Sequence, residues 1–107
     1  MTSQEALIHQ YALRRLAEVF HVSVESLLLD MKFGKELKAR PVSCFTENEF
    51  DVIDNDIRDV ADKAVLKEMA HGLLEIRTVE DYCKHMLRCN AVKPVDVARL
   101  LQLPKNE

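Results

Sequence analysis

Glycine and proline are scarce in this chain: its 107 residues include two glycines and three prolines. Hairpins and tight turns depend on these residue types, so a sandwich or barrel of many short strands is disfavoured. Hydrophobic residues make up 48% of the chain, which is enough to bury a core. We therefore expect a single all-α domain over residues 1–107, folded as a small bundle of four to five helices.

Three capping-box patterns mark expected helix starts, because Thr2, Thr46 and Thr78 are each followed three residues later by an acid. Apolar residues then recur at helical spacing and form stripes expected to face the core. The stripes comprise Ile8, Tyr11, Ala12, Leu16, Val19 and Phe20; then Phe50, Ile53, Ile57, Val60, Ala61 and Ala64; then Val79, Tyr82, Cys83, Met86 and Leu87. Arg15 and its charged neighbours are expected at solvent.

Several residues mark helix ends and additional elements. A short turn is expected from Val24 to Leu29. A break is expected near Asp62, followed by a shorter helix that Gly72 ends. Pro94 suits the first position of a last helix, which we place within residues 93–107.

The segment from Thr46 to Asp62 carries seven acids against one base, Arg58. Helical geometry turns four of its residues away from the apolar stripe. These outward residues are Asp51, Val52, Asp59 and Asp62. Such a face suits docking of a basic protein partner, with charge steering the encounter and Val52 anchoring it. The alternative is a solvated face that keeps the protein soluble, with Val52 an incidental exposed residue.

The sequence gives little support for a metal site or a catalytic site. Cys83, His85 and Cys89 share one predicted helix, but Cys83 lies well round the helix from His85. We expect a buried Cys83, a surface His85 and no metal site. The calcium-loop pattern that begins at Asp54 lacks its required Gly and Glu. No phosphate loop, nucleophile elbow or zinc-protease motif occurs, so the sequence indicates a protein that is not an enzyme.

Bulk composition bears on compartment and partners. The net charge of -3 provides no global field for a nucleic acid. Three cysteines without paired spacing fit free thiols, the N-terminus has no signal-peptide pattern, and no apolar run approaches the ~20 residues that span a bilayer. These features predict a cytoplasmic protein that binds neither membrane nor nucleic acid. They leave its oligomeric state open.

A DNA-binding regulator is the alternative function. Residues 16–28 resemble the end of a repressor-type helix-turn-helix, and residues 95–101 resemble the first helix of other such motifs. A small helix-turn-helix regulator would need a basic surface. The acidic middle of the chain would instead repel phosphates.

Taken together, residues 5–88 resemble an acyl carrier protein. That family has an amphipathic helix, a short turn, a Phe-x-x-Asp/Glu-Leu-Gly-Ala-Asp-Ser-Leu segment, an acidic recognition helix, a short helix and a last helix beginning Thr-Val-x-Asp/Glu. The matching segments are Val24-Glu-Ser-Leu-Leu, Phe33-Gly-Lys-Glu-Leu-Lys-Ala-Arg-Pro41 and Thr78-Val-Glu-Asp81. The resemblance implies an acyl-carrier-like bundle, with residues 93–107 forming an additional C-terminal helix.

In the family, the Ser of Asp-Ser-Leu carries the phosphopantetheine arm. Here the Asp and Ser places hold Arg40 and Pro41, and proline cannot accept that group. Ser43 lies nearby but lacks the flanking pattern. The resemblance therefore favours an interaction module without cofactor, with Ser43 as the residue to which a phosphopantetheine site would have moved.

Overall fold

The computed structural model describes residues 3–37 and 49–104, and within these ranges it contains five α-helices and no strand. The helices are α1 (Ser3–Phe20), α2 (Glu49–Val60), α3 (Lys63–Ala70), α4 (Val79–Asn90) and α5 (Pro94–Leu101), with one short 3-10 turn, η1 (Val24–Ser26). The predicted all-α bundle is confirmed. No described helix is both long enough and apolar enough to cross a membrane.

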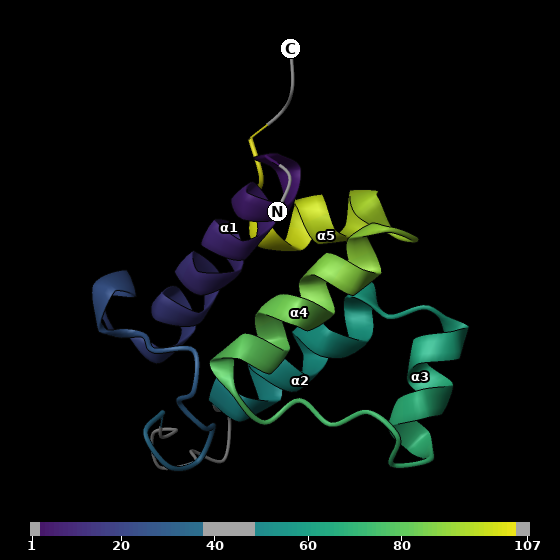
Figure 1. Ribbon diagram of the computed structural model, residues 1–107, viewed down its shortest axis with the longest axis horizontal. Coiled ribbons are helices and arrows are strands. Elements are labelled where there is room, and N and C mark those ends of the chain that lie inside the picture. The colour runs from purple at the N-terminus through teal and green to yellow at the C-terminus, as the bar shows by residue number, and fades with distance from the viewer. Residues whose placement is uncertain (1–2, 38–48, 105–107) are drawn as a thin grey trace.

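Helix α4 is the centre of the bundle. It packs against α1, α2 and α5, whereas the short α3 stands at the edge of the molecule (Figure 1). The side chains that the helices bury against each other form one core. Its most deeply buried members are Ile8, Leu16, Val60, Val79, Tyr82, Cys83, Met86 and Val97.

The predicted apolar stripe of α2 is confirmed at Ile53, Ile57 and Val60, which are all buried. Ala64 was expected on the same stripe, but it is exposed. The reason is that α2 ends at Val60, so Ala64 belongs to α3, whose only buried residue is Val65. The apolar periodicity of α2 therefore does not continue across the break into α3.

The predicted start of α4 is confirmed in atomic detail. The Asp81 amide donates to Thr78 Oγ1 at 3.1 Å, and the Thr78 amide donates to Asp81 Oδ2 at 3.1 Å, which is a complete capping box. Pro94 is likewise the first residue of α5, and Gly72 follows α3 with φ 72°. Thr2 and Thr46, the other predicted caps, lie outside the described residues.

The chain between α1 and α2 is pinned against the N-terminus of α4. The amides of Val79 and Glu80, which have no helical acceptor, donate to the carbonyls of Met31 and Leu29 at 3.0 and 2.9 Å. The amide of Phe33 donates to the Arg77 carbonyl at 2.9 Å. This anchoring places Phe33 beside the first turns of α2. Its ring also stacks on that of Phe20, the last residue of α1, with centroids 5.9 Å apart.

Candidate functional site

The outward acids of α2 occupy a solvent-facing side of the bundle, as predicted for two of them. Asp51 and Asp59 are exposed. Val52 is only partly exposed, so it presents less apolar surface than a protruding anchor would. Asp54 is also exposed and adds a further carboxylate, although Arg58 pairs with it at 3.1 Å across one turn. The acids of this side therefore form a charged surface, to which Arg58 and Lys93 bring positive charge: Arg58 pairs with Asp54, and Lys93 Nζ donates to the Asp59 carbonyl at 3.2 Å.

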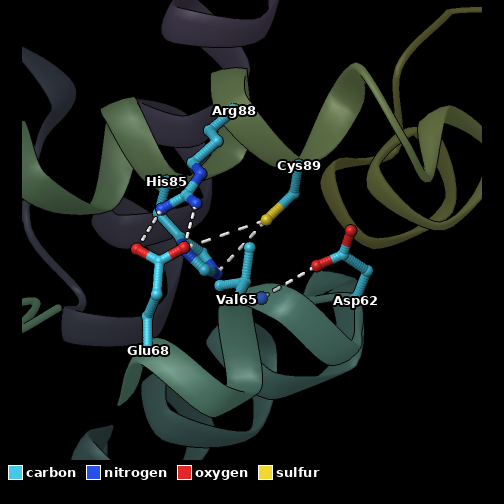
Figure 2. A network of polar contacts seen from close by, with 6 residues as sticks. All are labelled: Asp62, Val65, Glu68, His85, Arg88 and Cys89. Carbon is cyan, nitrogen blue, oxygen red and sulfur yellow. Dashed lines mark hydrogen bonds and ion pairs between the residues drawn. The ribbon is translucent and has the colours of Figure 1, made fainter. Parts of the chain in front are cut away.

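Asp62, the fourth residue of the predicted docking face, is partly buried at the start of α3. Its side chain accepts a hydrogen bond from the Val65 amide at 2.9 Å and so caps the N-terminus of α3 (Figure 2). An aspartate in this position typically stabilises a helix by about 1 kcal/mol. Reversing its charge would therefore remove a helix cap as well as a surface acid.

A groove of about 400 Å³ lies beside the acids of α2. Apolar side chains from three separate parts of the chain line it together with two carboxylates. The apolar lining residues are Phe33, Phe50, Ile53, Ile57 and Ile76, and the carboxylates of Asp51 and Asp54 complete the lining. The groove is open to solvent and combines apolar side chains with negative charge, which is the chemistry of a site for a cationic, amphipathic segment.

A buried charge lies on the inward face of α2 and was not predicted from the sequence. Asp56 is only 3% exposed. It accepts hydrogen bonds from Arg15 Nε at 2.9 Å, Arg15 Nη2 at 3.1 Å and the Tyr82 hydroxyl at 3.0 Å. The expectation that Arg15 faces solvent is therefore wrong, since this ion pair draws its guanidinium inward. The three residues tie α1, α2 and α4 together.

The chemistry of this cluster is structural. Burial, together with the neighbouring Asp56 carboxylate, raises the pKa of Tyr82 well above its ordinary value, so its hydroxyl stays protonated and donates. The hydrogen bond from Arg15 to Asp56 raises the pKa of Arg15. No buried side-chain nitrogen or oxygen in the described part of the chain lacks a partner. A satisfied network of this kind has no group poised to attack or to exchange a proton.

His85 is the second buried polar residue, at 3% exposure, and the expectation of a surface histidine is wrong. The Ala61 amide bonds to the Arg58 carbonyl, three residues back, so the Ile57 carbonyl loses its usual helical donor. His85 Nε2 lies 2.8 Å from this carbonyl and must carry the proton, because a carbonyl only accepts. Burial lowers the pKa of His85, which keeps the ring neutral. The residue completes the C-terminal end of α2.

Cys89 and His85 touch but do not form a reactive pair. The Cys89 sulfur is 3.6 Å from Nε2 and 3.9 Å from Nδ1, so it lies alongside the ring rather than in line with one nitrogen. Burial raises the pKa of Cys83 to about 12 and that of Cys89 to about 11. Thiols with these values are almost entirely protonated near neutral pH, which is unlike a nucleophilic cysteine. The prediction of a buried Cys83 is confirmed.

The edge helix α3 is held to α4 by a surface ion pair. Figure 2 shows Glu68 of α3 facing Arg88 of α4, whose Nη1 donates to Glu68 Oε1 at 3.0 Å. Beneath this pair the buried Val65 packs near Cys89, where the two helices and Val92 enclose a small cavity of about 130 Å³. Most of its lining residues are apolar, and Asp62 and Arg88 are the charged ones.

The remaining sequence hypotheses are limited by what the structure describes. Ser43 lies outside the described residues. Among the residues that are described, no three metal-ligating side chains gather into a cluster. Where a helix-turn-helix would place its second helix after α1, residues 24–26 form only the single turn η1. Comparisons of the chain with protein-family models, curated proteins and solved structures find no match.

Proposed function

We propose that this protein is a non-catalytic interaction module that docks a basic, amphipathic segment of a partner protein along α2. The observation that carries the proposal is the groove of about 400 Å³, which apolar side chains line together with Asp51 and Asp54. An apolar side chain of the partner would enter the groove while its Lys or Arg residues meet the acids.

The surroundings of the groove favour a cationic occupant. Asp59 does not line the groove, but it is exposed further along the same helix and adds to the negative charge of α2. The pair between Asp54 and Arg58 joins side chains that are 55% and 63% exposed, and such pairs contribute little and exchange readily. Arg58 therefore presents a small obstacle to a competing cation. Burial of apolar groups in the groove would supply affinity, and the acids would supply orientation.

The resemblance to acyl carrier proteins bears on the same surface. The helices follow one another as a long α1, an acidic α2, a short α3 and an amphipathic α4, with α5 after them. We propose on this basis that α2 is a recognition helix. A working carrier would need Ser43 as a displaced attachment site for phosphopantetheine, and mass measurement after incubation with coenzyme A and a broad-specificity transferase tests that variant of the proposal. We expect no mass increase.

The docking surface is tested with charge-reversal variants. Asp54→Lys and Asp59→Lys are combined, and Asp62 is left intact because it caps α3. The matched control combines Glu25→Lys with Asp30→Lys, which makes the same charge change at exposed positions outside α2. The probe is a fluorescent helical peptide with a leucine face and a lysine face, and its anisotropy reports binding.

We expect the α2 variant to bind the peptide about tenfold more weakly, since exposed charge pairs contribute up to ~1 kcal/mol each. The control should bind within about twofold of the wild type, and added salt should weaken wild-type binding. Equal loss in both variants would show that net charge alone attracts the peptide, and the docking surface would be rejected. Binding of duplex DNA that α2 charge reversal strengthens would support the helix-turn-helix alternative instead.

A further inference from the structure

A second pocket lies between α1 and the end of α5, away from the groove. Its volume is about 70 Å³, which is room for several water molecules and hence for a small organic ion. Polar and apolar groups both line it. The lining residues include Tyr11, Arg14, Arg15, Glu18, Leu100 and Gln102.

Arg15 presents a preorganised edge to this pocket. Its Nε and Nη2 groups are held by the buried Asp56 carboxylate at 2.9 and 3.1 Å, and the Tyr82 hydroxyl fixes that carboxylate from the other side. No other described residue accepts a hydrogen bond from this guanidinium, and the side chain is 23% exposed. Arg15 lines the pocket, and its Nη1 donors have no acceptor among the described residues. A guanidinium held in this way loses little freedom when it binds a second anion.

Arg14 supplies a second positive group at the same pocket. Its guanidinium carbon lies 4.7 Å from the centroid of the Tyr11 ring, a cation–π contact that limits where the side chain moves. Glu18 also lines the pocket and forms no ion pair with a described residue, so its carboxylate opposes a second negative charge. Two carboxylates, Asp56 and Glu18, already balance the two guanidiniums, so a second negative charge on a ligand would be unfavourable, which favours a monoanion over a dianion.

We propose that this pocket binds one small monoanionic carboxylate, held by Nη1 of Arg15 and by the guanidinium of Arg14. The apolar side of Leu100 accommodates a short alkyl group attached to that carboxylate. The site is independent of the docking surface proposed for α2, because none of its residues lines the groove.

The test uses sodium acetate as the probe and the NMR signal of the Arg15 Nε–H group as the reporter. Sodium chloride titrated to the same ionic strength gives the baseline. We expect a saturable shift with acetate and only a small, linear drift with chloride. Inorganic phosphate at pH 8, where it is mainly a dianion, should bind more weakly than acetate to the wild type.

Two single substitutions and one matched control decide the outcome. Arg14→Gln should weaken acetate binding up to about fivefold, and Glu18→Gln should strengthen it by a similar factor, because each changes one exposed charge at the pocket. Arg77→Gln, an exposed arginine elsewhere, should leave acetate binding unchanged. Arg15 itself is not substituted, since its loss would also break the buried ion pair.

Equal, non-saturating shifts with acetate and chloride would overturn the proposal, and so would equal effects of Arg14→Gln and Arg77→Gln. The Asp54→Lys, Asp59→Lys variant should retain acetate binding. Its behaviour therefore separates failure of this site from failure of the docking surface.

Discussion

Replacing Asp56 with alanine should be among the most damaging single changes to this fold. The substitution leaves the Tyr82 hydroxyl buried without its acceptor, which costs about 1–3 kcal/mol. It also removes two charge-assisted hydrogen bonds to Arg15, whose 23% exposed side chain recovers part of that loss in water. We therefore expect a decrease of about 2–4 kcal/mol in the free energy of unfolding.

Two further substitutions separate the stabilising effect of the buried charge from the effect of removing any acid from α2. Asp56→Asn keeps an acceptor for Tyr82 but loses the charge, so about 1–2 kcal/mol is expected. Asp54→Ala removes an exposed acid from the same helix and should cost under about 0.5 kcal/mol beyond helix propensity. Urea unfolding followed by the helical circular dichroism signal measures all three. Each kcal/mol lost from the free energy of unfolding also corresponds to a decrease of roughly 4 °C or more in the melting temperature.

The mechanism itself is tested by a second substitution. Adding Tyr82→Phe to the Asp56→Ala background removes the orphaned hydroxyl, so the double variant should be at least as stable as Asp56→Ala alone. If Asp56→Ala costs no more than Asp54→Ala, the buried cluster contributes nothing and this reasoning is refuted. A double variant that is much less stable than the single one would show that packing of Tyr82, not its hydrogen bond, dominates.

The other expectations concern the buried titratable groups of α4. Because burial lowers the pKa of His85 below its ordinary value of 6.5, the native state resists protonation, and stability should decrease as the pH falls below about 6.5 toward that lowered pKa. Urea midpoints at pH 7.5 and 5.5 measure this, and a decrease of the same size in His85→Gln would contradict it. Native Cys83 and Cys89 should react with iodoacetamide at least about a hundredfold more slowly than after denaturation, since their pKa values rise from 9.0 to about 12 and about 11. Peptide mapping by mass spectrometry identifies the alkylated thiols, and rapid labelling of either one in the native protein would show that it is accessible and ionised.

Local patterns predicted much of this fold because the signals they carry are local. The start of α4 depends on Thr78 and Asp81, three residues apart, and the start of α5 depends on Pro94 alone. The buried face of α2 follows from the spacing of Ile53 and Ile57. The groove was not predictable in this way, because its lining joins residues from α2 with residues from two separate connecting segments.

The buried polar residues were missed even though their positions carried a signal. Asp56 is three residues after Ile53 and four before Val60, so it belongs to the inward face of α2. His85 stands in the same relation to Tyr82 and Cys89 on α4. Residue type predicts the opposite of spacing at these positions, since most acids and histidines are exposed. What spacing could not supply is the partner, because Arg15 is 41 residues away from Asp56 in sequence.

The two faces of α2 therefore carry separable tasks. On the inward face, Asp56 and the Ile57 carbonyl make directional contacts to α1 and α4, and such contacts specify one helix register where apolar stripes alone would tolerate sliding. On the outward face, Asp54 and Asp59 make no contact of that kind with the core. Changes in partner binding at these outward positions can then be interpreted as surface effects. Asp62 is the exception, because its carboxylate belongs to the fold as the cap of α3.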